Sequence, residues 1–162
     1  MAESSEAEHT VLDVVTETVI HRPLDVVAAY AADPANATRW YANIKSVEWL
    51  TAPPLRAGTR LAFVAKFLGR RLVYTYEVID FAPRARLVMK TAEGPFPMET
   101  EYTWTTIGSD ATRMTLRNRG NPTGFSQLFV PFMTVAVRSA NRKDLARLKQ
   151  LLESGAAPAT RA

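Results

Sequence analysis

The sequence predicts an α+β fold in which a curved antiparallel sheet wraps around one long C-terminal helix. Between positions 58 and 118, short runs of alternating apolar and polar residues follow one another, separated by compact turn sequences. This alternation is typical of strands with one buried face. From position 124 to 153 the apolar spacing becomes helical, and the first half of that segment is apolar nearly all round. Such a helix needs the concave side of a sheet, because it is too apolar to lie in water.

The N-terminal part predicts a strand, two short helices and a second strand. The first strand is rich in β-branched residues, and Pro23 suits the first position of the helix that follows. Pro34 ends that helix and restarts a shorter one that ends at Trp40, while Pro53 and Pro54 stop the second strand. The predicted bounds are 11–20, 23–32, 34–40 and 44–50.

Turn signals then divide a meander of further strands. We expect Gly69-Arg70 to form a two-residue hairpin with glycine at positive φ, and Pro83-Arg84 to preset the next turn. The segments 94–97 and 108–110 close the remaining hairpins. The strands predicted between these turns are 59–67, 71–81, 86–91, 98–106 and 112–119. The last helix is expected to begin near Ser126, with Pro131 either kinking it or starting its regular part.

Alternation places aromatic, methionine and a few hydroxyl or amide side chains on the inner face of the meander. Its arginines and lysines, with Glu77, Glu99 and Glu101, are expected on the outer face. The inner set either lines a ligand pocket, with the polar members fixing the ligand's orientation, or fills the interior as core. Together with the inward candidates of the last helix, the predicted ligand-binding residues are Phe63, Phe67, Tyr74, Tyr76, Met89, Met98, Thr100, Tyr102, Trp104, Asn118, Phe129, Phe132, Met133 and Val137.

Length and composition fit an ordinary soluble protein with one domain over 11–153 and disordered ends at 1–10 and 154–162. The chain has 162 residues, of which 47% are hydrophobic and 22% charged. No apolar run approaches the roughly 20 residues that span a bilayer. There is no secretory signal, so we expect a cytoplasmic location. The absence of cysteine excludes disulfides, a thiol nucleophile and thiolate metal sites.

The net charge of +4 comes largely from the last helix, through Arg138, Arg142 and Arg147 among others. A nucleic-acid partner would require exposed stacking aromatics or a recognised motif, and neither is present, so we expect no nucleic acid. Docking on a membrane surface would require exposed bulky apolar residues opposite the charges. The simpler interpretation is a solvated helix face.

Candidate catalytic groups are few, and we assign none. His9 lies in the N-terminal segment, and His21 has no histidine or carboxylate at metal-ligand spacing, so we expect no metal. No nucleophile elbow, phosphate-binding glycine loop or dinucleotide fingerprint occurs, and we expect no cofactor. Arg39 is the one basic residue that could reach a pocket mouth, although a surface position over Trp40 is the simpler interpretation. Trp40 is expected to pack its helix onto the sheet.

Four segments carry a resemblance to a known family: VIHRPLDVV at 19–27, ATRWY at 37–41, VIDFAPRARL at 78–87 and DLARLK at 144–149. With the order of elements, they make the chain similar, over 11–153, to the START-like, Bet v 1-like (SRPBCC) superfamily. Within it, the chain resembles the bacterial polyketide cyclase/dehydrase-type proteins. The resemblance implies the helix-grip fold, a seven-stranded curved antiparallel sheet around the last helix with an internal cavity.

The resemblance and the residues together leave three functional hypotheses. The first is binding of a small hydrophobic or aromatic ligand, lipid-like or polyketide-like, in that cavity. The second is a polyketide cyclase/aromatase or dehydrase-type enzyme that uses the same cavity. The third is an interaction module that works through the basic last helix. The cavity entrance is expected near the short helices, the loop at 94–98 and the first half of the last helix, beside 120–124 (GNPTG).

Overall fold

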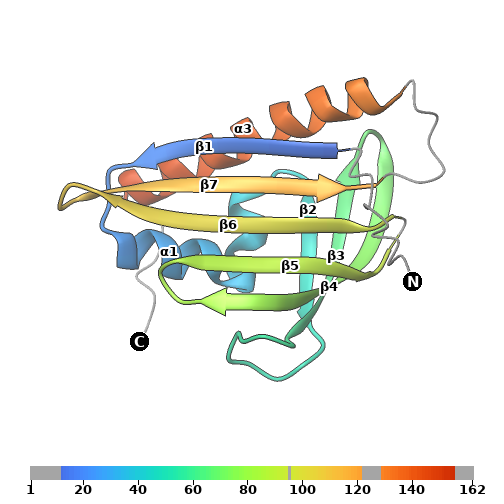
Figure 1. Ribbon diagram of the computed structural model, residues 1–162, viewed down its shortest axis with the longest axis horizontal. Coiled ribbons are helices and arrows are strands. Elements are labelled where there is room, and N and C mark those ends of the chain that lie inside the picture. The colour runs from blue at the N-terminus through green and yellow to red at the C-terminus, as the bar shows by residue number, and fades with distance from the viewer. Residues whose placement is uncertain (1–11, 95, 122–128, 156–162) are drawn as a thin grey trace, which may run out of the picture.

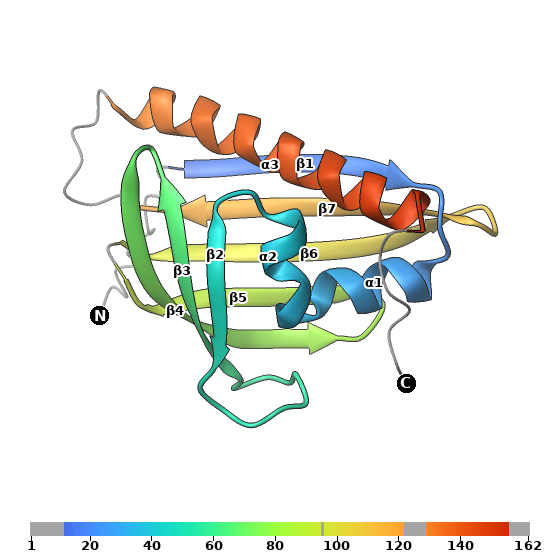
Figure 2. The same cartoon turned by 180° about the vertical axis from the view of Figure 1, so that it is seen from behind.

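The computed structural model describes residues 12–94, 96–121 and 129–155, and it confirms the predicted fold class (Figures 1 and 2). Seven antiparallel strands form one curved sheet, and a long C-terminal helix crosses its concave side. The strands are β1 Leu12–Ile20, β2 Ile44–Trp49, β3 Arg60–Phe67, β4 Arg70–Ala82, β5 Arg86–Glu93, β6 Met98–Ile107 and β7 Ala111–Gly120. The helices are α1 Leu24–Ala32, the 3-10 helix η1 Pro34–Asn36, α2 Ala37–Trp40 and α3 Val130–Glu153.

The sheet order, β1-β7-β6-β5-β4-β3-β2, follows from one crossover and a series of hairpins. After β1 the chain passes through α1, η1 and α2 to β2 at the far edge of the sheet. Consecutive hairpins then return it strand by strand until β7 pairs with β1, with Leu12 opposite Gly120. Helix α3 packs against β1 and α2, and so covers the concave side of the sheet.

Most element bounds agree with the prediction to within two residues, and the main difference is a turn. The β3–β4 hairpin turns at Leu68-Gly69 rather than at Gly69-Arg70, because Phe67 pairs directly with Arg70. Both turn residues have positive φ, 49° and 76°, as a two-residue turn of the type I′ class requires. Pro131 starts the regular part of α3 instead of kinking it.

Several predictions fall on residues that the structure does not describe. These are the disordered ends, apart from Ser154 and Gly155, which follow α3 as a turn. They also include the predicted helix start near Ser126 and most of the GNPTG segment. Among the described residues, no helix combines the length and the apolar character that crossing a membrane requires.

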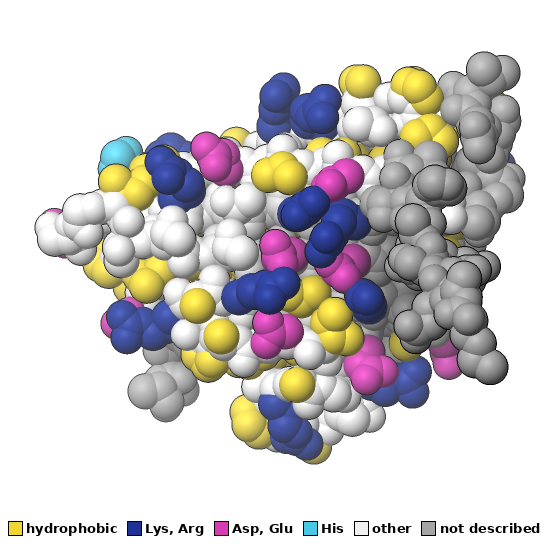
Figure 3. All heavy atoms as spheres, in the orientation of Figure 1, with side chains coloured by type: hydrophobic (Ala, Val, Ile, Leu, Met, Phe, Trp, Pro, Cys, Tyr) yellow, Lys and Arg dark blue, Asp and Glu magenta, His cyan; other side chains and the backbone are white. Residues whose placement is uncertain are grey.

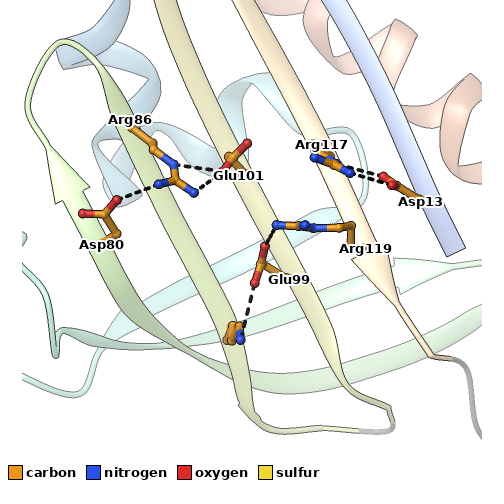
Figure 4. Close-up of polar contacts among 8 residues, drawn as sticks. Asp13, Asp80, Arg86, Glu99, Glu101, Arg117 and Arg119 are labelled. Carbon is orange, nitrogen blue, oxygen red and sulfur yellow. Dashed lines mark hydrogen bonds and ion pairs between the residues drawn. The ribbon is translucent and has the colours of Figure 1, made fainter. Parts of the chain in front are cut away.

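The outer face of the sheet carries ion pairs between neighbouring strands, as the alternation predicts (Figure 4). Arg86 of β5 donates from Nη2 to Oε2 of Glu101 on β6 at 2.5 Å and from Nη1 to Asp80 at 3.1 Å. Arg117 of β7 contacts Asp13 of β1 at 2.7 Å. Pairs of this kind at a surface stabilise a fold by at most about 1 kcal/mol each. Their main effect is to keep this face in water, so that the opposite face is buried.

The buried side chains form two clusters on the concave side. The larger one joins α1, α2 and the C-terminal half of α3 to the sheet, and includes Trp40, Met114 and Leu148, all 0% exposed. The smaller one joins Leu12 and Val14 of β1 to Met133 of α3. Residues from both clusters line a single cavity, so the packed interior leaves a space between its two parts.

Candidate ligand-binding cavity

A cavity of about 170 Å³ lies between the concave face of the sheet, the short helices and α3. An apolar cavity of roughly 150 Å³ is enough to hold benzene. Pockets for drug-sized ligands are usually larger, roughly 300–1,000 Å³. In this conformation the space therefore fits a single ring or a short chain, and a larger ligand would require the walls to move.

Most of the predicted binding residues surround this cavity. On the sheet these are Phe63, Phe67, Tyr74, Tyr76, Met89, Met98, Thr100, Tyr102 and Asn118, and on α3 they are Met133 and Val137. Their contribution to ligand binding stays a prediction.

Trp104, Phe129 and Phe132 do not line the cavity. Trp104 is buried in the core, where its ring meets that of Tyr102 edge to face at 6.0 Å. Phe129 and Phe132 are each 57% exposed on the outside of α3, which corrects their predicted inward orientation. At about 100° per residue, a helix that turns Met133 and Val137 inward turns Phe132 toward solvent. Phe129 precedes the first residue of α3.

One wall of the cavity consists of aromatic rings that also pack against each other. Phe63 stacks on Tyr74 with ring centroids 5.5 Å apart, and Tyr76 meets both rings edge to face. Offset and edge contacts of this kind stabilise an aromatic cluster beyond its area burial. The rings therefore form an apolar wall and leave the cavity beside them open.

A chain of hydrogen bonds crosses the cavity wall from β4 to α3. Tyr76 and Thr100 share a hydroxyl hydrogen bond of 2.9 Å, and Asn118 donates from Nδ2 to Thr100 Oγ1 at 2.9 Å. Asn141 of α3 donates in turn to Asn118 Oδ1 at 2.6 Å. Burial raises the pKa of Tyr76 to about 12, so its hydroxyl stays protonated near neutral pH.

A second polar group combines two tyrosines and an aspartate. The hydroxyls of Tyr41 and Tyr102 lie 2.5 Å apart. Asp144 of α3 is 3% exposed and accepts a hydrogen bond from the Ala42 backbone N–H at 3.0 Å. Burial raises the pKa of Asp144 to about 6, although the Ala42 hydrogen bond and the Arg147 charge oppose this shift.

The two tyrosines and Asp144 share one region of the cavity. Burial is the largest cause of the raised pKa values of both tyrosine hydroxyls, and the Asp144 charge adds to it. An acid that titrates near neutral pH therefore lies beside two protonated hydroxyls. Such a set can bind a ligand oxygen and exchange a proton with it.

The predicted binding set omits other lining residues, among them Trp40, Tyr41, Asn141 and Asp144. The two polar residues of α3 had a readable signal, since they share the helical spacing of Val137 and Leu148 and thus interrupt an apolar stripe. Trp40 both packs α2 in the core and lines the cavity. Arg39 is exposed and is not part of the lining.

Comparison with known proteins agrees with this architecture. The family model described as "Polyketide cyclase / dehydrase and lipid transport" matches residues 12–153. Among curated proteins, none matches the sequence significantly.

Solved structures with the same fold cover nearly the whole chain. TTHA0849 from Thermus thermophilus aligns with a TM-score of 0.76 at 19% identity, covering 90% of this chain and 99% of its own. The Zhui aromatase/cyclase from Streptomyces sp. R1128 aligns with a TM-score of 0.76 at 16% identity, covering 93% and 98%. A START superfamily protein from Mycobacterium smegmatis aligns with a TM-score of 0.67 at 16% identity, covering 88% and 95%.

At these identities the structural matches establish the fold alone, whereas the family model spans both sheet and last helix. The family resemblance of the four sequence segments is thereby confirmed: the chain has the fold of the START superfamily protein, and it belongs to the polyketide cyclase / dehydrase and lipid transport family.

Proposed function

We propose that this protein binds a small hydrophobic or aromatic molecule, lipid-like or polyketide-like, in the cavity between the sheet and α3. The observation that carries this proposal is a space of about 170 Å³ left open inside a largely apolar lining. Family membership supports the same role, since the family description includes lipid transport. The lining has few polar side chains, and several of them are hydrogen-bonded to each other. In ligand sites of this kind, apolar burial provides affinity and hydrogen bonds fix the orientation of the ligand.

The expected energetics favour a compact ligand with one polar end. Burying apolar surface contributes about 25 cal/mol per Å², so a ring placed against Phe63 and Tyr74 gains most of its affinity there. A hydroxyl or carbonyl on the same molecule would then reach the Tyr41–Tyr102 pair or Asn118. A polar end that found no partner would itself be buried without a hydrogen bond, at a cost of about 1–3 kcal/mol.

A thermal-shift screen with single-ring aromatics and short-chain lipids tests this function, together with native mass spectrometry of the purified protein. We expect ligands with one polar end to raise the Tm of the wild-type protein. Ala140→Leu, which fills part of the cavity, should abolish that rise while leaving the unliganded Tm equal or higher. Ala146→Leu, on the exposed side of the same helix, is the matched control and should respond as wild type. Equal responses of both variants would contradict the proposed site.

Asp144 supports a second candidate function, an enzyme of the cyclase/aromatase or dehydrase type. A buried carboxyl group with a pKa of about 6 is suited to accept a proton near neutral pH. The hydroxyl of Tyr102 and the amide of Asn118 lie on the same lining and could polarise a substrate carbonyl.

For this enzyme we expect Asp144→Asn, Tyr102→Phe and Asn118→Ala to lose turnover of a polyketide-like substrate while still folding. Tyr76→Phe, which breaks the bond to Thr100, should lower turnover too. Single-turnover product analysis measures the effect, with Asp110→Asn on the exposed β6–β7 turn as control. Wild-type turnover in all four cavity variants would show that this site assignment is wrong.

A further inference from the structure

The N-terminal half of α3 presents large apolar side chains to solvent. Phe129 and Phe132 are 57% exposed and Val135 is 63% exposed. Phe132 and Val135, three residues apart, lie on a side of the helix turned away from Met133 and Val137, which line the cavity. Phe129 immediately precedes the helix, one turn before Phe132, and is exposed at this end. Figure 3 shows hydrophobic side chains gathered along this part of α3. Clustered exposed rings of this size on a soluble protein mark an interaction surface.

Basic residues continue the same side of the helix in the following turns. Arg138, Arg142 and Lys143, together with Val135 and Ser139, line a hollow on the surface of α3. Within residues 12–94, 96–121 and 129–155, none of these three cations forms an ion pair. Arginines on the outer face of the sheet, such as Arg86 and Arg117, form ion pairs with aspartate or glutamate (Figure 4). The three cations of α3 have no such acidic partner among the described residues.

We propose that this face of α3, formed by Phe129, Phe132, Val135, Arg138, Arg142 and Lys143, docks on an anionic lipid surface. Rings and aliphatic side chains of this kind enter the boundary between head groups and acyl chains, while adjacent cations contact lipid phosphates. This is the combination of charge and exposed apolar residues that a membrane-surface role requires, and it does not depend on which ligand occupies the cavity.

Other occupants match this surface less well. In a symmetric dimer through the same face, three unpaired cations of each copy would approach those of the other, with repulsion as the result. A nucleic acid would neutralise the cations, yet it would leave Val135 and most of the ring surface against a charged backbone. An anionic bilayer surface provides an apolar phase for the exposed rings and Val135, and phosphates for the three cations.

Docking in this orientation would bring the cavity wall close to the lipid. Met133 and Val137 lie on the inner side of the same turns, and a helix with its side chains is only about 10–12 Å across. A hydrophobic molecule leaving the bilayer would thus have a short path to the cavity.

Flotation with phosphatidylcholine vesicles, with and without phosphatidylserine, tests the proposal on the full chain. We expect binding to the anionic vesicles alone, weakened by salt because exposed charges are screened. Phe129→Ser/Phe132→Ser should lower partitioning about tenfold or more, and Arg138→Glu/Arg142→Glu should lower it about fivefold or more for each charge removed.

Matched controls separate this face from general effects of hydrophobicity and charge. Val15→Ser/Val73→Ser removes apolar side chains that are 52% and 53% exposed on the sheet, and Arg113→Glu reverses an exposed charge on β7. Both should bind vesicles as wild type does, and circular dichroism checks that every variant folds.

Three results would overturn the proposal. The first is equal binding to neutral and anionic vesicles, or none to either. The second is a dimer in sedimentation equilibrium that Phe129→Ser/Phe132→Ser dissociates, which would assign the face to a second copy. The third is that the protein binds heparin but not vesicles, and that Arg138→Glu/Arg142→Glu weakens the heparin binding.

Discussion

Asp144 is the residue on which the chemistry of the cavity most depends. It occupies a position of the α3 stripe that an apolar side chain would fill, and its carboxylate is held by the Ala42 backbone N–H. Removing a charge from water favours the protonated form, and this is why the pKa of Asp144 rises to about 6. Burying Asp144 at the cavity therefore lowers the free energy of unfolding at pH values where its carboxyl group is ionised.

The pH dependence of stability follows from this shift. The pKa of Asp144 is higher in the folded protein than its ordinary value of 3.8, so between these two pH values the folded state binds more protons than the unfolded state. The free energy of unfolding therefore falls as pH rises through this window. Relative to wild type, Asp144→Asn should gain about 1–2 kcal/mol between about pH 4 and pH 7, after allowance for partial hydration of the carboxylate.

Urea unfolding of both proteins at the two pH values measures this gain. Asp110→Asn, on the exposed β6–β7 turn, is the control and should show no comparable change. A constant difference between wild type and Asp144→Asn across the range would contradict the assigned role of burial.

At the level of elements, the β3–β4 hairpin offers a direct test of its turn geometry. Leu68 adopts φ of 49°, a left-handed backbone conformation that is unfavourable for leucine. Its side chain is 53% exposed, so burial offsets little of that cost. Asn-Gly is the favoured pair for such a turn. We expect Leu68→Asn to raise the free energy of unfolding by about 0.5–1 kcal/mol.

Gly69→Ala is the opposing variant for this hairpin. A side chain at φ of 76° is strained although no neighbour crowds it, so we expect a loss of about 1 kcal/mol. Chemical denaturation measures both variants against wild type. A destabilised Leu68→Asn would show that the exposed leucine makes contacts that outweigh its backbone strain.

Strand faces could be predicted from sequence, whereas the rotation of α3 could not. Side chains of a strand alternate between the two faces of the sheet, so one buried residue such as Leu116 indicates which face each other residue of its strand occupies. The pairing of strands then extends these faces to the next strand. The first half of α3 is apolar nearly all round, so no periodic signal separates Phe132 from Met133. The polar positions Asn141 and Asp144 face inward and carry that information, because they align with Leu148.

For the molecule as a whole, the order of strands and helices predicted the fold class, and four short sequence segments added the family. The size of the cavity could not be predicted, because it depends on how rings such as Phe63, Tyr74 and Tyr76 pack against each other. The Tyr41–Tyr102 contact was equally out of reach, since it joins residues 61 positions apart that no local pattern relates. Local periodicity therefore predicts that the sheet and α3 enclose an interior, whereas the volume of the cavity inside depends on tertiary packing.

The wide sequence separation of the lining residues affects how the protein is made. Leu12 and Asp144 are far apart in the sequence but border the same cavity, and β1 joins the rest of the sheet only by pairing with β7. During synthesis, the β-meander must leave the ribosome well before α3 does. Its concave apolar face is therefore uncovered in the nascent chain, and a ligand can be enclosed only after α3 has been synthesised.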